Sequence, residues 1–415
     1  MKVLQVNKFD IRYGAGRAAY RLHSRLRAAG LQSEYFVMRK ESDDSSIFKP
    51  ETDCDRLLAV MSSPLDSLPL RRYRHRGSGF WSVNWFRNGF DKYIRQSGAD
   101  IINLHWIGGG FLQIASLGSI PQPLVWTMHD SWAFTGGCHV PGDCERYRDA
   151  CGACPQLGSG MMHDLSHAGF RRKQKVWGRV AMTIVAPSTW LASRLRSSRL
   201  LADKRIEVIP NGIDTDVYRP IEKKEARGLL SLPQDATLIL SGAVSVYTDR
   251  NKGFHLAAEA VRHMTGKKLL PKAELILFGA SAPRDVPDLG LRTRFMGHLY
   301  DDISLALLYS AADVFIAPSL QENLPNTVME AMSCGTPCVA FDIGGMPDLI
   351  VPGKTGYLAR PFEAEDFAQG IAWIICNRER HDMLSRESRA KILRGFSIED
   401  ISQRYIDLYR EIITT

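Results

Sequence analysis

The sequence of 415 residues has no uncharged apolar run of the roughly 18 residues that a membrane-spanning helix needs. It also has no internal repeat and no low-complexity segment. Charged residues make up 24% and hydrophobic residues 45%, which argues against a disordered scaffold, a collagen-like chain or a coiled coil. The first residues, MKVLQVNKFD, turn polar too early for a signal peptide, so we expect a cytoplasmic protein. The length predicts two or three domains.

The net charge of +8 is unevenly distributed along the chain. Residues 1–212 hold 30 Lys and Arg against 18 Asp and Glu, a net charge of +12, which leaves −4 for the rest. Such asymmetry suits nucleic acid, an anionic lipid surface or a phosphorylated ligand. No RNA- or DNA-binding motif accompanies the charges, so we expect no nucleic-acid partner.

An alternation of strands and helices begins at the N-terminus. A buried strand (Lys2–Asn7), a glycine-containing loop (Lys8–Gly16), a helix with apolar residues at helical spacing (Arg17–Ala29) and a second strand (Glu34–Met38) follow one another. This order is typical of a parallel α/β sheet. Further strands are expected at Asp100–Trp106, Leu124–His129 and Thr183–Pro187.

The alternation then starts again. A second set of strands is expected at Thr237–Ala243, Glu274–Gly279, Asp313–Pro318, Pro337–Asp342 and Gly356–Ala359. We therefore predict an α/β protein with two Rossmann-like domains, 1–212 and 213–395, facing each other across a cleft. The segment Val208–Pro220 has turn residues and little hydrophobic periodicity, so it is the expected hinge. An amphipathic helix within 396–415 is expected to pack back on the first domain.

The segment Asp313–Pro347 is the most informative part of the sequence. A strand ends at Pro318, a loop holds Glu322, and a helix that carries Glu330 starts near Pro325–Asn326. The free amides of Asn326–Val328 form an anion site at the carboxyl edge of the sheet. Carboxylates near a helix start also occur simply as partners of the helix dipole, so residue types alone leave both interpretations open.

Two Glu separated by seven residues in this frame resemble the Glu-x7-Glu signature of retaining glycosyltransferases of family 4, which have the GT-B fold. The segments APS, CGTPCVA, GG-P and PGKTGYL resemble that family too, and the likeness extends over nearly the whole chain. The resemblance implies that Glu322 binds hydroxyls of the donor sugar and that Glu330 binds the nucleotide ribose. Where relatives are glycine-rich, this chain has Asn323, Leu324 and Pro325. The residues implied in donor binding by backbone contacts are Asn323, Leu324, Asn326 and Thr327.

The family also places an Arg shortly after a strand and a Lys five residues later, both on the donor diphosphate. Lys252 fits the Lys, but Ala243 stands at the usual place of the Arg, and Arg250 is expected to substitute from a lengthened loop, as in relatives resembling colanic-acid and exopolysaccharide transferases. A fixed cation stabilises the charge of a departing diphosphate. The alternative is that both are solvated loop residues.

Two further features of the front domain bear on the site. Gly14 and Gly16 formally satisfy the dinucleotide fingerprint, but they come too far after the strand, so we expect them to contact donor phosphate or acceptor. His129 follows a strand, and the family carries an active-site His at the matching place. His105 ends the preceding strand and is a weaker candidate.

A tight group of cysteines lies in an insertion at about 136–156. In a reducing cytosol, four Cys at this density favour a structural zinc site over disulfides, and unpaired thiols are the alternative. The group consists of Cys138, Cys144, Cys151 and Cys154. We expect the insertion to shape the acceptor side of the cleft.

The basic run Arg71–Arg76 precedes an aromatic stretch that includes Trp81, Trp85 and Phe86. This combination suits an anionic membrane interface, although a solvated loop explains it equally well.

The sequence as a whole predicts a retaining glycosyltransferase that uses a nucleotide-diphospho-sugar and a glycan or lipid-diphosphate-linked acceptor in polysaccharide biosynthesis, on the inner face of the plasma membrane. We expect same-face substitution without a catalytic cofactor or divalent metal. The alternatives are a catalytically silent nucleotide-sugar-binding protein and an NAD(P)-dependent oxidoreductase.

Overall fold

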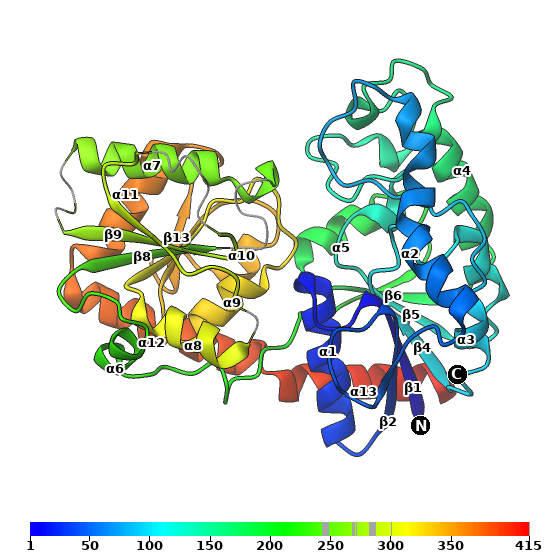
Figure 1. Ribbon diagram of the computed structural model, residues 1–415, viewed down its shortest axis with the longest axis horizontal. Coiled ribbons are helices and arrows are strands. Elements are labelled where there is room, and N and C mark those ends of the chain that lie inside the picture. The colour runs from blue at the N-terminus through cyan, green and yellow to red at the C-terminus, as the bar shows by residue number, and fades with distance from the viewer. Residues whose placement is uncertain (243–248, 268–269, 271, 282–287, 300, 415) are drawn as a thin grey trace. The chain divides into compact units, whose positions relative to one another are not determined.

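The structure is a computed structural model that describes residues 1–242, 249–267, 270, 272–281, 288–299 and 301–414. Its contacts divide the chain into two compact units. The first unit consists of Met1–Pro210 together with Ser402–Thr415, and the second is Asn211–Ile401. Figure 1 labels their helices and strands. Each unit is an α/β structure with one parallel sheet, which confirms the predicted fold class.

The sheet of the first unit has the strand order β3-β2-β1-β4-β5-β6-β7, and every described pairing is parallel. The central strands β1, β4, β5 and β6 are nearly continuous runs of buried residues instead of alternating patterns, as is typical of parallel sheets covered on both faces. The strands are β1 (Lys2–Phe9), β2 (Gln32–Arg39), β3 (Ile47–Phe48), β4 (Ile101–Leu104), β5 (Leu124–Thr127), β6 (Met182–Ala186) and β7 (Arg205–Val208).

The helices of the first unit come mostly from its N-terminal residues, but the last comes from the end of the chain. They are α1 (Tyr13–Ala28), α2 (Asp53–Ser67), α3 (Asp91–Arg95), α4 (Leu165–Trp177), α5 (Thr189–Arg196) and α13 (Ile398–Thr414). The part of α13 from Ser402 onward belongs to this unit. Its Tyr405 and Tyr409 are buried, and their hydroxyls contact Thr127 on β5 and Asn103 on β4.

The sheet of the second unit has the order β10-β9-β8-β11-β12-β13. Its strands are β8 (Thr237–Gly242), β9 (Ala273–Phe278), β10 (Arg292–Phe295), β11 (Val314–Ala317), β12 (Cys338–Phe341) and β13 (Gly356–Ala359). Its helices are α6 (Lys223–Leu229), α7 (Phe254–Gly266), α8 (Asp302–Ala311), α9 (Asn326–Ser333), α10 (Met346–Leu349), α11 (Ala364–Ile375) and α12 (Arg378–Gly395). Figure 1 shows α7 and α11 on one face of this sheet and α8 and α9 on the other, each covering its own apolar core.

The predicted loop Lys8–Gly16 is wrong at its end. Helix α1 already begins at Tyr13, so Gly14 and Gly16 lie in its first turn. A Cβ on Gly16 would come within 3.0 Å of the Asp10 carbonyl oxygen. Gly16 therefore permits the close approach of the helix to the end of β1, and the missing side chain serves packing at this point.

None of the helices in the described part of the chain is both long and apolar enough to cross a membrane.

Candidate active site

The second unit brings Lys252 and Glu322 together, two residues that are far apart in the sequence. The Lys252 Nζ lies 2.7 Å from Glu322 Oε1, and the Ser319 hydroxyl donates to the same oxygen at 3.0 Å. Burial by itself lowers the pKa of Lys252, but the charge and hydrogen bond of Glu322 outweigh it, and the pKa is raised. The lysine therefore stays cationic at neutral pH beside the loop that follows β11.

Two glycines allow the backbone around this pair to pack tightly. Gly253 has φ +69°, and a Cβ there would lie 1.8 Å from the Pro318 carbonyl oxygen. Gly344 has φ +55°, and a Cβ there would lie 2.0 Å from the carbonyl oxygen of Glu322. The amide of Gly345 donates to that same oxygen at 3.1 Å. The Glu322 loop is thus held between two segments that only glycine can supply.

Helix α9 begins at Asn326 directly after Pro325, as the sequence predicts. Its first amides have no acceptor within the helix, and its dipole favours an anion there. Glu330 on this helix is 3% exposed, and its Oε2 accepts a hydrogen bond of 2.9 Å from the Tyr309 hydroxyl. The tyrosine, which the sequence analysis missed, fixes the carboxylate from α8.

The remaining predicted donor-binding residues have different environments. The Leu324 side chain is buried in the apolar core, so only its backbone is available to a ligand. Asn323 and Thr327 are half-buried, and the Asn326 Oδ1 accepts from Asn211 Nδ2 at 3.3 Å. Arg250 lies exposed in a short turn before Lys252. Ala243, which stands in place of the family's arginine, lies outside the described residues.

In the first unit, His129 lies just after β5 and contacts a second histidine. Its Nε2 is 3.0 Å from Nδ1 of His105, and Nε2 of His105 is 2.8 Å from the Gln5 side-chain oxygen. Burial lowers the pKa of His129 to about 4, opposed by the charge of Asp130. Burial also lowers the pKa of His105 far below its usual value. Both rings are therefore neutral at pH 7.

The neighbour of His129, Asp130, belongs to another buried group. Its Oδ2 accepts from Trp106 Nε1 and from His139 Nδ1, both at 2.6 Å. The Nε2 of His139 lies 2.7 Å from Ser82 Oγ, which also accepts the amide of Gly109 at 2.8 Å. Ser82 is 1% exposed.

Ser82, His139 and Asp130 are thus connected by hydrogen bonds as in a catalytic triad. The serine is buried, however, and is not accessible as a nucleophile. The group holds the segment after β5 in place. Sequence analysis did not find Ser82 or His139, because the contact between them joins segments far apart in the chain and leaves no local pattern.

All four cysteines of the insertion, Cys138, Cys144, Cys151 and Cys154, are free and line one small cavity. Burial raises the pKa of Cys138 and raises that of Cys151 to about 12. Within the described ranges, no group of three or more His, Cys, Asp or Glu side chains is arranged to hold a metal ion. Zinc binding therefore stays a prediction from the clustering of four cysteines in the sequence.

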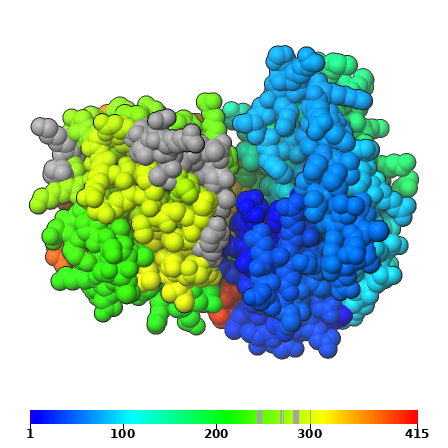
Figure 2. All heavy atoms as spheres, viewed as in Figure 1, coloured from blue at the N-terminus to red at the C-terminus, as the bar shows by residue number. Residues whose placement is uncertain are grey.

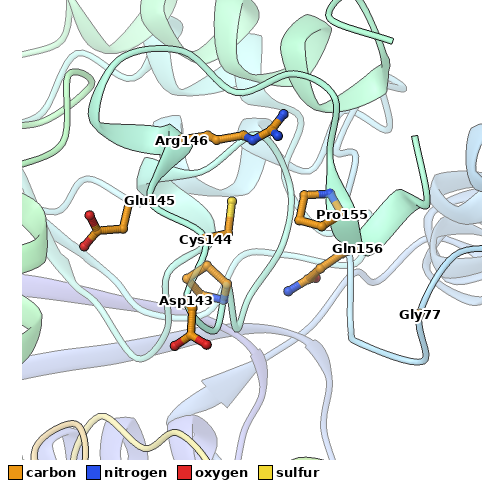
Figure 3. Close-up of a pocket in the computed structure, with 8 residues that line it drawn as sticks. Gly77, Asp143, Cys144, Glu145, Arg146, Pro155 and Gln156 are labelled. Atoms are coloured by element: carbon orange, nitrogen blue, oxygen red, sulfur yellow. The ribbon is translucent and has the colours of Figure 1, made fainter. Parts of the chain in front are cut away.

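Beside these cysteines lies an open pocket of about 620 Å³ (Figure 3). Its polar lining includes Asp143, Glu145, Arg146 and Gln156. The Arg146 guanidinium donates to the carbonyl oxygens of Gly152 and Ala153, which fixes the loop around the pocket. The charged and amide groups of this lining can donate and accept hydrogen bonds.

Comparisons with known proteins identify both halves of the chain. Residues 13–217 match the family model described as Glycosyltransferase Family 4, and residues 237–377 match Glycosyl transferases group 1. D-inositol 3-phosphate glycosyltransferase of Saccharomonospora viridis is 29% identical over 224 residues, which cover 51% of each chain. The chain spans about half the length of the curated relatives it matches.

Solved structures resemble the chain over its whole length. Sucrose-phosphate synthase from Thermosynechococcus elongatus has a TM-score of 0.68 at 19% identity, with 100% of both chains covered. Anabaena HepE in complex with UDP-glucose has a TM-score of 0.67 at 18% identity, covering 99% of this chain and 100% of its own. At these identities the likeness shows the fold, which is GT-B. Because the two family matches together cover most of the sequence, the chain belongs to the group 1, or family 4, glycosyltransferases.

Proposed function

We propose that the protein is a retaining glycosyltransferase that moves a hexose from a nucleotide-diphospho-sugar to a glycan or lipid-linked acceptor in exopolysaccharide-type biosynthesis. The main observation in support of this proposal is the Lys252–Glu322 ion pair, whose carboxylate lies in the segment before the start of α9. It combines a cation and the first amides of α9 for a diphosphate with a carboxylate for sugar hydroxyls. Binding of UDP by structural neighbours supports a nucleotide-sugar donor.

The proposed mechanism is substitution on one face of the sugar. Lys252, Arg250 and the first amides of α9 stabilise the charge that develops on the leaving diphosphate. Glu322 holds hydroxyls of the transferred sugar, and Glu330 holds those of the nucleotide ribose. The acceptor hydroxyl attacks as the bond to phosphate breaks, and the departing phosphate oxygen takes its proton. His129 contacts the transferred sugar in this proposal.

A thermal-shift screen against UDP-, GDP-, ADP- and dTDP-sugars tests the donor assignment, followed by a transfer assay with the best binder. We expect one nucleotide class to raise the melting temperature, and NMR of the first-formed product to show the anomeric configuration of the donor. Inversion would contradict the retaining mechanism. Tight binding with neither transfer nor donor hydrolysis would favour the silent binding protein.

The acceptor is proposed to bind the open pocket beside the insertion. Asp143 and Glu145 can accept hydrogen bonds from glycan hydroxyls there. Replacing Asp143 by Ala should raise the acceptor KM several-fold and leave the donor KM unchanged. Exposed Asp235 in the second unit provides a control for the loss of one carboxylate.

A membrane surface is proposed as the place of action, on observations around α2. Exposed Leu57, Val60, Met61 and Leu68 recur at helical spacing, with side chains 39% to 64% exposed. Exposed arginines follow at once, namely Arg71, Arg72, Arg74 and Arg76. Figure 2 shows residues 50–75, in mid-blue, on the surface of the first unit. An apolar stripe with a cationic border fits an anionic lipid surface.

The sequence analysis combined the basic run with an aromatic stretch at the membrane interface, and this prediction is wrong for Trp81. Trp81 is 7% exposed and its ring packs against Gly137, so it cannot reach lipid. Neutralising the four arginines to Gln should weaken sedimentation with phosphatidylglycerol vesicles but not with phosphatidylcholine. Four exposed arginines elsewhere serve as the control set: Arg378, Arg386, Arg394 and Arg410. If both four-arginine variants lose vesicle binding equally, net charge alone explains the effect and the membrane surface is not located at these arginines.

A further inference from the structure

A line of buried polar side chains runs from the last helix to His129. Gln5 in the middle of β1 is fully buried, and His105 directly after β4 is 3% exposed. Gln5 contacts His105 at 2.8 Å, and His105 contacts His129 at 3.0 Å. The first two residues have no access to a ligand, so they can act on one only through His129, which is half-buried.

The direction of the hydrogen bonds in this line follows from the amide of Gln5. Its Nε2 points to the Tyr409 hydroxyl on α13, at 3.5 Å, so its oxygen faces His105. A carbonyl oxygen only accepts, so Nε2 of His105 carries the ring proton and donates it. In a neutral ring the other nitrogen is then unprotonated. His105 Nδ1 therefore accepts from Nε2–H of His129.

This order leaves Nδ1 of His129 unprotonated. No hydrogen bond to that atom is present among the residues that the structure describes. Both rings are neutral at pH 7, because burial lowers their pKa values, so each ring has a single proton and the line has a single direction.

The anchoring of Gln5 is shared with the neighbouring strand. The Tyr409 hydroxyl also accepts from Asn103 Nδ2 at 2.7 Å, and the Asn103 oxygen accepts from Thr127 Oγ1 at 3.1 Å. Strands β1, β4 and β5 and helix α13 thus contribute to one polar network in an otherwise apolar interior. Hydrogen bonds in such a low-dielectric interior are stronger than in water, so the network holds its members in place.

We propose that Gln5 and His105 are positioning residues that hold His129 with its proton on Nε2, so that Nδ1 accepts a hydrogen bond from a hydroxyl of the transferred sugar. A histidine fixed in this way selects a ligand group that donates and disfavours a carbonyl or phosphate oxygen. The inference rests on the proposed function for the identity of the ligand. The proton position itself does not depend on it.

Nitrogen-15 NMR of the imidazole rings tests the proton position in the full chain. We expect His129 and His105 each to show a protonated Nε2 and an unprotonated Nδ1 at pH 7. Protonated Nδ1 on His129 would overturn the proposal. This measurement stands even if no nucleotide sugar is ever transferred, so the two proposals can fail separately.

A matched pair of variants tests the positioning role. His105→Asn keeps a hydrogen-bond acceptor near the position of Nδ1. His105→Leu has a side chain of about the same size as asparagine but has no hydrogen-bond acceptor. Loss of an oriented hydrogen bond predicts a kcat roughly 10- to 100-fold lower in His105→Leu, with partial recovery in His105→Asn and an unchanged acceptor KM. His105→Leu should also show mixed ring protonation of His129.

Gln5→Leu provides a second, independent variant, because it removes the acceptor two positions away from the ligand. We expect the same loss of kcat and the same mixed ring protonation. Melting temperatures identify any variant that fails to fold. If the folded His105→Leu and Gln5→Leu proteins keep wild-type kcat, or if His129 keeps its proton on Nε2 in both, the positioning role is refuted.

Discussion

Replacing Lys252 by Met would leave the Glu322 carboxylate with the Ser319 hydroxyl as its one side-chain hydrogen-bond donor among the described residues. The two charges are 2.7 Å apart, and their side chains are 26% and 16% exposed. At an effective dielectric constant of 20, the attraction is about 6 kcal/mol before the cost of removing both charges from water. Exposed pairs contribute about 0–1 kcal/mol, and breaking a fully buried pair costs about 3–5 kcal/mol. For this partly buried pair, we expect a loss of about 1–3 kcal/mol.

A double-mutant cycle, in which urea unfolding gives the stability of each variant, measures the interaction energy between Lys252 and Glu322. The single variants are Lys252→Met and Glu322→Gln, and the double variant should recover part of the stability that each single change loses. If the losses simply add to within about 0.5 kcal/mol, the pair does not interact and the reasoning is refuted. With a nucleotide sugar, Lys252→Met should also lower kcat by roughly 100- to 1000-fold, because it removes a cation from the leaving group.

Other predictions concern the loop, acid stability and the cysteines. Gly344→Ala should lower both the melting temperature and nucleotide-sugar affinity because its Cβ meets the Glu322 carbonyl. Gly353→Ala, with φ +74° and no atom within 4 Å, serves as the control for backbone strain alone. His23 has its pKa lowered by burial to about 4. Between pH 6.5 and 4 the unfolded state binds a proton on His23 that the folded state does not. The free energy of unfolding should therefore fall by roughly 3 kcal/mol on acidification through that window. Urea unfolding of His23→Gln should show a smaller fall. Metal analysis should find about one zinc per chain, and a folded metal-free preparation would contradict the zinc prediction.

The fold class was predictable because its signals are local. Buried strands alternate with amphipathic helices, and each is legible within ten or fifteen residues. The strands that sequence analysis missed are β3, β7 and β10. Two of them, β7 and β10, contain no fully buried residue, and β3 has only two residues. All three are edge strands, where one neighbour is missing and the hydrophobic pattern is correspondingly weak.

The site was predictable only in part, because only some of its residues lie in local sequence patterns. The positions of Glu322 and Glu330 follow from a strand, a loop and a helix start within one segment. Gly14 and Gly16 were predicted in the loop Lys8–Gly16, but the packing of α1 against β1 places them in the first turn of the helix. Gln5 could not be found. It lies in a strand where any residue is expected to be buried, and its role depends on His105, a hundred residues later.

The basic surplus of the front part of the chain is less available to a partner than its net charge of +12 suggests. Lys8 and Arg21 are at most 8% exposed, and Lys173 is fully buried. Lys173 donates to the carbonyl oxygens of Trp132 and Thr135 and lies 3.7 Å above the Trp132 ring. Lys173 thus holds two loop segments in place, and none of the three side chains is open to solvent. A membrane surface would therefore meet the arginines after α2 in particular, which is why the vesicle experiment compares positions at constant net charge.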